Sequence, residues 1–274
     1  MRVQHNMQAA NANRMLGGNV KAVAKNTEKL SSGYKVNRAA DDAAGLSISE
    51  KMRNQIKGIN QAVSNSEDGQ YLIQTAEGNM NEIHSILQRM GELATKAAND
   101  VNQSVDREAI QKEINQLTQE IDSIANKAQF NGTYLLRENK TLNLQVGANA
   151  GENMTINLKK MDSVTIGVNV SGYIALSIGT HSHAAGAMAA ITSAIKTVSA
   201  NRSALGAIQN RLDYTINNLM NYSENLTSAE SNIRDTDMAK EMVNYSKNNI
   251  LQQTAQSMLA QANQSNQGVL SLLQ

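Results

Sequence analysis

The sequence predicts a mostly α-helical protein: an elongated antiparallel helical bundle or coiled coil with a small β-hairpin region and paired terminal helices. The chain of 274 residues has no proline, the strongest helix breaker. Aromatic residues make up only 3% of it, which is few for the core of a compact domain of this length. Apolar residues recur at steps of three and four over long stretches, which is the spacing of a helical seam.

The first predicted helix runs from Val3 to Leu30, and we do not expect it to be stable alone. Gly17-Gly18 weakens its centre by about 1 kcal/mol per glycine relative to alanine. A single apolar stripe has nothing to bury against, so this helix needs a partner helix. The stripe includes Leu16, Val20, Val23 and Leu30.

The longest predicted helix covers residues 43–98 and follows a glycine stop at Gly33. Asp41 and Asp42 precede it, where a carboxylate accepts hydrogen bonds from the free N–H groups of the first turn. We interpret them as a helix cap rather than a metal or acid–base site, because no His, Cys or third carboxylate is near in the sequence. The long helix predicts a rod, against which residues 106–128 fold back as an antiparallel helix.

The pattern changes after this helix. Gln129-Phe130-Asn131-Gly132-Thr133 ends it with a glycine stop, and we expect Phe130 to close the end of the bundle. Residues 141–159 alternate between apolar and polar on both sides of a Gly- and Asn-containing turn, which predicts a β-hairpin with one face on the helices.

Residues 161–186 are predicted to be a short variable loop. Val164, Ile166, Val168 and Val170 alternate with other residues and favour a further strand. His181 and His183 are the chain's one closely spaced His pair, and we expect them in an exposed loop rather than a metal site, because no third ligand is visible.

Helical spacing resumes at Ala187 and continues to a second boundary at Asp235-Thr236-Asp237. The last helix runs from Met238 to Leu273, and its apolar tip should be buried by an assembly or a partner, because chain ends are normally polar. We therefore predict one domain of terminal helices, residues 1–42 and 235–274, and a bundle domain, residues 43–234.

Composition and motifs exclude several functions. The net charge of +1 gives no reason to expect nucleic acid as a partner. The sequence contains no apolar run of 18 residues, so we expect no membrane insertion. The start of the chain lacks the apolar core of a signal peptide. We find no phosphate-binding loop, nucleophile elbow or metal motif, so we expect no enzyme activity, catalytic residue, cofactor or metal.

Several segments together resemble bacterial flagellins, over roughly residues 12–160 and 187–274. The longest is Glu28–Met52, which reads EKLSSGYKVNRAADDAAGLSISEKM. Shorter ones are Gln74-Thr-Ala-Glu-Gly78, Leu87-Gln-Arg-Met90, Phe130-Asn-Gly132, Leu144-Gln-Val-Gly-Ala148, Arg202–Arg211, Arg234-Asp-Thr-Asp237 and Val269-Leu-Ser-Leu-Leu273.

The resemblance implies a secreted structural subunit that polymerises into the extracellular flagellar filament for motility. The short loop over residues 161–186 implies a flagellin without outer variable domains. The implied partners are other copies of the chain, an export chaperone at the C-terminal segment, a filament cap and a hook–filament junction protein. The implied polymerisation residues are Leu16, Val20, Val23, Leu30, Leu251, Met258, Leu259, Val269, Leu270 and Leu273.

Some flagellins are ligands of Toll-like receptor 5, and the resemblance places that contact at Arg89, Leu93 and Glu113. Gly91 and Lys96 depart from the residues frequent in the family nearby. The nearest alternative function is a hook–filament junction protein, which shares flagellin-like ends. A second alternative is a secreted helical immune ligand or adhesin.

Overall fold

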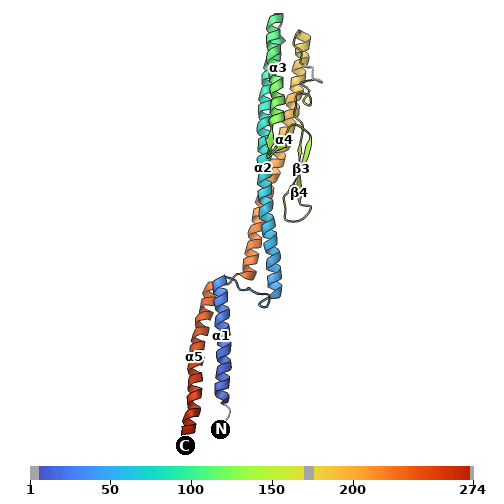
Figure 1. Ribbon diagram of the computed structural model, residues 1–274. Coiled ribbons are helices and arrows are strands. Elements are labelled where there is room, and N and C mark those ends of the chain that lie inside the picture. Colours follow the sequence, from blue (N-terminus) through green and yellow to red (C-terminus); the bar gives the residue numbers. More distant parts are fainter. Residues whose placement is uncertain (1–5, 170–175, 272–274) are drawn as a thin grey trace. The chain divides into compact units, whose positions relative to one another are not determined.

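The computed structural model describes residues 6–169 and 176–271, and for residues 266–271 it describes the backbone only. Helices dominate these ranges, which confirms the predicted mostly α-helical class (Figure 1). The helices are α1 (Met7–Ser32), α2 (Ala43–Ala97), α3 (Ser104–Lys127), α4 (His181–Arg234) and α5 (Met238–Ser271). The strands are β1 (Gln129–Phe130), β2 (Thr133–Tyr134), β3 (Lys140–Gln145) and β4 (Asn153–Leu158).

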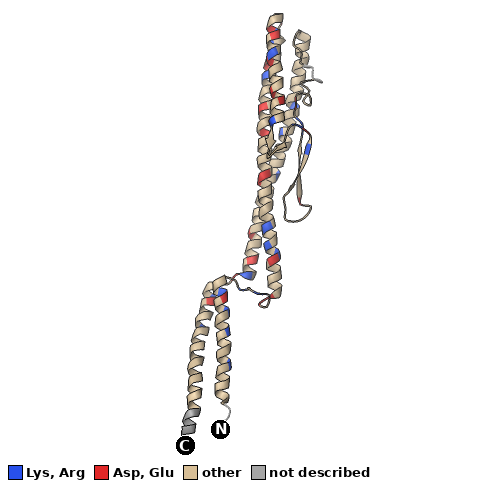
Figure 2. Cartoon of the chain, viewed as in Figure 1, with Lys and Arg blue, Asp and Glu red and all other residues tan. Residues whose placement is uncertain are grey.

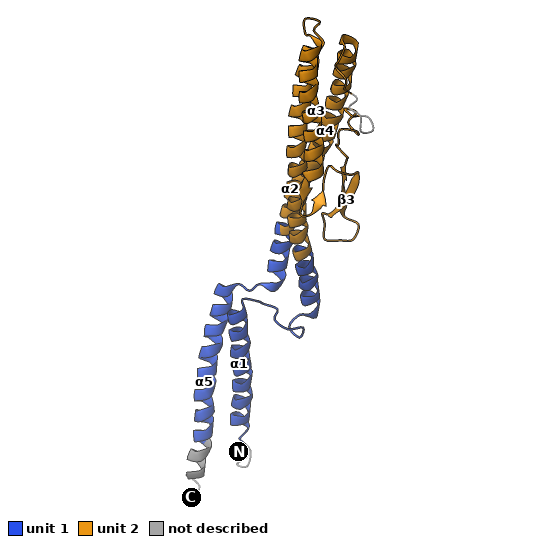
Figure 3. Cartoon of the chain, turned by 45° about the horizontal axis from the view of Figure 1, so that its top comes forward, with its two compact units in different colours: residues 1–56, 224–274 blue, residues 57–223 orange. Residues whose placement is uncertain are grey.

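The chain divides into two compact units, which Figure 3 colours separately. Unit 1 contains residues 1–56 and 224–274, and unit 2 contains residues 57–223. Helices α2 and α4 each contribute residues to both units. The sequence predicts a division into two domains at residues 42 and 235, which are helix ends, whereas these units divide within α2 and α4. The predicted domain division stays a prediction.

Unit 2 is built around a closed apolar core between α3 and the adjoining parts of α2 and α4. The three-and-four spacing of the sequence places its apolar residues on the inward faces of these helices. Burying one such side chain contributes about 1.5–3 kcal/mol, so this seam holds the unit together. Side chains at 0–1% exposure include Ile73, Met80, Ile83, Leu87, Ile114, Ile121, Ile191 and Val198.

The predicted hairpin is confirmed as the antiparallel pair β3–β4, in a register from Lys140 opposite Leu158 to Gln145 opposite Asn153. Every second side chain of β4 faces the core, and Ile156 is 0% exposed. The hairpin approaches α2 so closely that a Cβ added at Gly69 would collide with the side chain of Leu144. A side chain at this position would therefore require the end of the Leu144 side chain to move.

A second hairpin, β1–β2, was not predicted from the sequence. Its turn is Asn131-Gly132, and both residues have positive φ, 47° and 75°. This pair of left-handed residues is typical of the type I′ turn that joins two strands tightly. The sequence pattern of the same residues indicates only the end of a helix. Phe130 is half-buried and packs against the core, beside the end of α3.

The strand predicted over residues 164–170 is wrong for its described part, which consists mainly of turns. Asp122 of α3 holds this segment by accepting hydrogen bonds from the backbone N–H and the hydroxyl of Ser163, both at 2.8 Å. The carbonyl of Ser163 in turn accepts from the N–H of Val168 at 2.9 Å. The apolar alternation here buries side chains in turns, while Val170 lies outside the described residues.

The expected loop at His181 and His183 is also wrong, because α4 begins at His181, before the predicted start at Ala187. The hydroxyl of Thr180 accepts a hydrogen bond from the N–H of His183 at 3.3 Å and so caps the first turn. Both histidines are exposed, as expected.

The predicted helix boundaries at Gly33, before Ala43 and at Asp235-Thr236-Asp237 are confirmed by their caps, whereas α1 begins at Met7 and not at the predicted Val3. The side chain of Asp42 accepts from the N–H three residues later at 2.9 Å and begins α2. Asp237 does the same for α5 at 3.1 Å. Asn6 begins α1 in this way at 3.0 Å, and Gly33 ends it in the left-handed conformation with φ of 75°.

We predict that Leu87→Ala lowers the free energy of unfolding of unit 2 by about 2–5 kcal/mol, because it leaves a cavity in a closed seam. Urea unfolding followed by circular dichroism measures this change. The matched control is Tyr71→Ala on the same helix, where the side chain is 59% exposed, and its effect should stay within about 0.5 kcal/mol. Equal effects of the two substitutions would contradict the closed core.

Candidate assembly surface

The terminal helices α1 and α5 pair with each other inside unit 1 and run antiparallel. At one end the N–H of Thr236 donates to the carbonyl of Gly33 at 2.9 Å. At the other end Nδ2 of Asn6 donates to the carbonyl of Ala262 at 2.9 Å. These two bonds fix which residues of the two helices lie at the same level.

No described side chain among the proposed polymerisation residues is buried. Val20 is 44% exposed, Leu251 is 42% exposed and Met258 is 55% exposed. The apolar faces of this helix pair therefore remain open, in contrast to the closed core of unit 2. The half-buried members are Leu16, Val23, Leu30 and Leu259. Val269 and Leu270 lie where only the backbone of α5 is described, and Leu273 lies outside the described residues.

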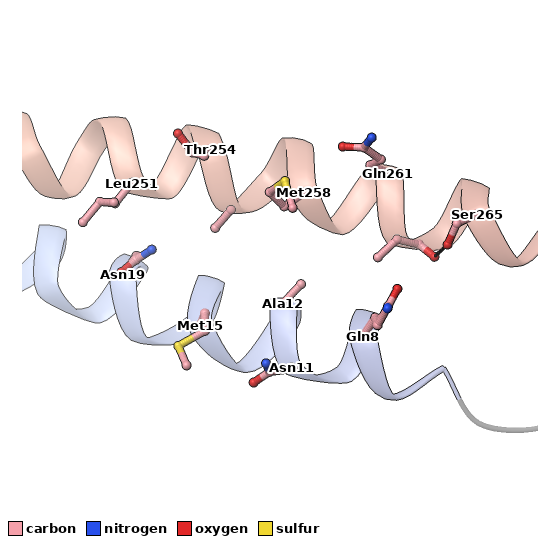
Figure 4. Close-up of a pocket in the computed structure, with 12 residues that line it drawn as sticks. Gln8, Asn11, Ala12, Met15, Asn19, Leu251, Thr254, Met258, Gln261 and Ser265 are labelled. Atoms are coloured by element: carbon pink, nitrogen blue, oxygen red, sulfur yellow. Dashed lines mark hydrogen bonds between the residues drawn. The ribbon is translucent and has the colours of Figure 1, made fainter. Parts of the chain in front are cut away.

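A groove with a cavity volume of about 690 Å³ lies between α1 and α5. Figure 4 shows the side chains that line it, with Ala12 and Leu251 each pointing toward the opposite helix. Met15 and Met258 add flexible thioether side chains, which adapt to irregular contacts. The remaining lining is mostly amide and hydroxyl side chains, so the groove is apolar with neutral polar edges.

Charge is almost absent from the far part of this helix pair. No residue after Lys247 carries a charged side chain, and Figure 2 shows the described part of this stretch in the tan of uncharged residues. Gln, Asn, Ser and Thr take the polar positions instead. Neutral amides and hydroxyls are buried at a much smaller cost than ions when they find hydrogen-bond partners. This surface is therefore suited to burial against protein.

Near the other end of the pair, Tyr34 lies between two guanidinium groups. Its ring centroid is 5.4 Å from Cζ of Arg53 and 4.7 Å from Cζ of Arg234. Its hydroxyl accepts a hydrogen bond from Nη2 of Arg53 at 2.9 Å, the main cause of a raised pKa for Arg53. Arg53 also lies 3.1 Å from Glu230, and Arg234 donates to Glu50 at 2.7 Å. We name these five residues the Tyr34 junction.

The Tyr34 junction ties the connection after α1 to the first turns of α2 and the last turn of α4. Backbone contacts support the junction. The N–H of Lys35 donates to the carbonyl of Arg234 at 2.6 Å, and Tyr34 forms an isolated antiparallel β-bridge with Asp235. Sequence reasoning missed this cluster. The sequence spacing of Tyr34 and its partners gives no signal of contact.

Asp41 has a different role from Asp42, although the sequence suggested one cap. It pairs with Lys25 at 2.7 Å and accepts backbone N–H bonds from Asn37 and Arg38. The hydrogen bond from Lys25 is the main cause that lowers the pKa of Asp41. Because folding lowers the pKa of Asp41, its ionised carboxylate stabilises unit 1 at every pH above the ordinary pKa of an aspartate. This stabilisation is lost as the pH falls through the lowered pKa of Asp41 in the folded chain.

The structure brings two of the three proposed receptor residues together on the surface of unit 2. Nε and Nη2 of Arg89 donate to one carboxylate oxygen of Glu113 at 3.1 and 3.0 Å, and Nη1 donates to Glu92 at 3.1 Å. The carboxylate of Glu113 is the main cause of a raised pKa for Arg89. Leu93 is only 3% exposed and belongs to the core, because it continues the inward stripe of α2.

Comparison with known proteins identifies the family. The bacterial flagellin N-terminal helical region matches residues 3–141, and the C-terminal helical region matches residues 188–273. A flagellin of Halalkalibacterium halodurans is 52% identical over 274 residues, and a flagellin of Bacillus subtilis is 47% identical over 303 residues. Both alignments cover 100% of each chain. The chain belongs to the bacterial flagellin family.

This flagellin is a structural, non-enzymatic subunit of the extracellular flagellar filament, which serves motility. A solved structure from Vibrio parahaemolyticus, assigned to the flagellar hook-associated proteins, has a TM-score of 0.61 and covers 71% of this chain and 100% of its own. Its sequence identity is 15%, so it shows a shared fold alone. Full-length identity is to flagellins, which favours the filament subunit over the hook–filament junction protein.

Two negative observations concern only the described part of the chain. Its helices include none with the length and apolar character needed to cross a membrane. Within the same ranges, no three His, Asp or Glu side chains gather in a way that would hold a metal ion.

We predict that Tyr34→Ala loosens the connection between α1 and α2, because it removes a ring held by two cations, worth about 1–2 kcal/mol. Limited trypsin digestion should then cut after Lys35 and Arg38 about tenfold faster than in the natural chain. Tyr34→Phe keeps the ring and loses only the hydroxyl, so its effect should be smaller. Cleavage after Arg211, on α4 within unit 2, is the internal control and should not change. Unchanged cleavage in Tyr34→Ala would contradict a stabilising junction.

Proposed function

We propose that α1 and α5 are the polymerising elements of this flagellin and that they become fully ordered only when neighbouring subunits cover them. The observation that carries this proposal is the contrast in burial between the two units. Unit 2 encloses its apolar residues, whereas the described apolar residues of α1 and α5 keep part of their surface open. Surface left open in the single chain is the driving force for association.

Marginal terminal helices also favour a mechanism in which folding and assembly are coupled. An isolated pair of helices gains too little burial to offset its ordering entropy, and the missing burial comes from neighbours. The neutral stretch after Lys247 supports this mechanism, since it adds no charged group that must lose water on assembly. The bundle folds first, and the ends follow on the growing filament.

We further propose the partners that the family implies. An export chaperone covers the C-terminal segment, whose apolar and neutral residues are suited to burial against protein. The filament cap receives the subunit, and a hook–filament junction protein contacts the first subunits through the same terminal helices. Each contact uses a surface that the filament later covers.

For Toll-like receptor 5, we propose a contact at Arg89 and Glu113. Both are surface residues, with side chains 53% and 45% exposed, and Arg89 presents a planar donor group suited to acidic or carbonyl partners. Leu93 would support α2 from inside. Gly91 leaves the surface beside Arg89 without a side chain, and an added Cβ there would lie 3.8 Å from Ile191, so packing does not require this glycine.

We predict that deleting residues 263–274 abolishes polymerisation and leaves unit 2 folded. Electron microscopy after seeding scores filaments, and the thermal unfolding transition of unit 2 scores folding. Long filaments from the truncated chain would contradict the role of α5.

A point substitution tests the apolar face more finely. Met258→Asp places a charge in the groove between the helices and should raise the critical concentration for assembly at least about tenfold, since a buried unpaired charge costs several kcal/mol. The matched control is Ser199→Asp, which adds the same charge at an exposed polar position of α4 in unit 2 and should assemble. Equal inhibition by both would show that charge, rather than position, decides.

For the receptor, we predict that Arg89→Ala weakens binding to the purified receptor ectodomain about tenfold, because it removes a charged anchor and releases Glu113. Surface plasmon resonance measures the affinity. Lys196→Ala on exposed α4 is the matched control and should bind normally. Unchanged affinity in Arg89→Ala would remove this assignment.

A further inference from the structure

The two described side chains of α1 and α5 that are buried are both polar. They are Asn26, at 8% exposure, and Glu241, at 7% exposure. The larger apolar residues described on these helices are half-buried or exposed. Polar residues thus occupy the best-covered positions of the helix pair, the reverse of the arrangement in unit 2.

These two residues lie at the same level of the pair. The bond between Gly33 and Thr236 fixes one level of the antiparallel pair, and Asn26 lies seven residues before Gly33. The residue level with Asn26 is therefore seven residues after Thr236, which is Val243. The same count from the bond between Asn6 and Ala262 gives Met242. Glu241 is therefore one or two residues from the level of Asn26, which is about 1.5–3 Å along the helix axis.

Their chemistry is complementary. Nδ2 of Asn26 is buried and has no hydrogen-bond partner among the described residues. An amide nitrogen donates two hydrogen bonds and a carboxylate accepts them. A buried donor without an acceptor is destabilising, so a small adjustment that brings Nδ2 to the Glu241 carboxylate would be favoured.

We propose that Asn26 and Glu241 fix the register of α1 against α5 in the assembled subunit. This proposal rests on the proposed function of these helices in polymerisation. Apolar patterning alone specifies the register weakly, because α5 repeats Gln, Asn and Ala along much of its length. A slip by one heptad would move Asn26 and Glu241 about seven residues apart along the pair, so that they could no longer bond each other. A single buried polar pair is a known way to select one register of two helices.

Cysteine cross-linking tests this register directly, because the chain contains no cysteine of its own. Ala12→Cys with Ala255→Cys reports the register observed here, since the two end bonds place Ala255 within one or two residues of the level of Ala12 and Ala262 five or six residues away. Ala12→Cys with Ala262→Cys reports a slip of one heptad. Filaments of the full chain are treated with a short bismaleimide, and the cross-link within one chain is separated from links between chains by size.

With Asn26 and Glu241 unchanged, nearly all of the cross-linked product should come from the observed register. Asn26→Leu should raise the ratio of slipped to observed product at least tenfold. The matched control is Asn13→Leu, at an exposed position of α1 outside the groove, which should leave the ratio unchanged. Asn26→Asp should also slip, because two carboxylates would then face each other, and Asn26→Asp with Glu241→Gln should restore the ratio by exchanging amide and carboxylate.

Two failures are distinguishable. If the natural chain forms no filaments under the electron microscope, the proposed function fails. If filaments form and Asn26→Leu leaves the ratio unchanged, the register proposal is overturned. The proposal is also overturned if the double variant Asn26→Asp with Glu241→Gln slips as much as Asn26→Asp alone. A loss of filaments in Asn26→Leu with the rescue pair still assembling in the observed register supports the proposal.

Discussion

The structure depends on how much apolar surface a given number of helices can enclose. Three helical segments of unit 2 and the β3–β4 hairpin surround a common seam, so Ile83, Leu87 and Ile114 reach 0% exposure. Two helices have only one shared face, and Leu251 and Met258 of α5 stay 42% and 55% exposed although α1 lies beside them. One unit is therefore complete in the single chain, and the other needs more protein around it.

Periodicity predicted the helices well because a seam of three-and-four steps has few alternative structures. The β3–β4 hairpin was equally readable, since two alternating stretches flank a turn. Val164 to Val168 alternate in the same way, yet no described strand pairs with them, and Asp122 holds the segment in turns. Alternation reports which side chains face inward, and it becomes a strand only where a partner strand exists.

The candidate sites show the same limit from another direction. The family pattern placed Leu93 at a receptor contact, whereas its 3% exposure puts the side chain in the core of unit 2. The Tyr34 junction gave no sequence signal, because Tyr34, Arg53 and Arg234 meet only after the chain has folded. Asn26 looked like any helix residue for the same reason. Contacts between distant polar residues are not encoded in a local pattern.

The distribution of polar groups differs between the closed bundle and the helix pair that we propose to assemble. Charges in unit 1 gather near the connections, at the Lys25–Asp41 pair and the Tyr34 junction, where each ion has a partner. Beyond Lys247 the polar residues are neutral, so burying them on assembly removes water from amides and not from ions. A surface without ions has no charge pairs with which to select the orientation of its partner. The specificity that charged pairs would provide must therefore come from a few buried polar contacts, and Asn26 with Glu241 stands where such a contact is needed.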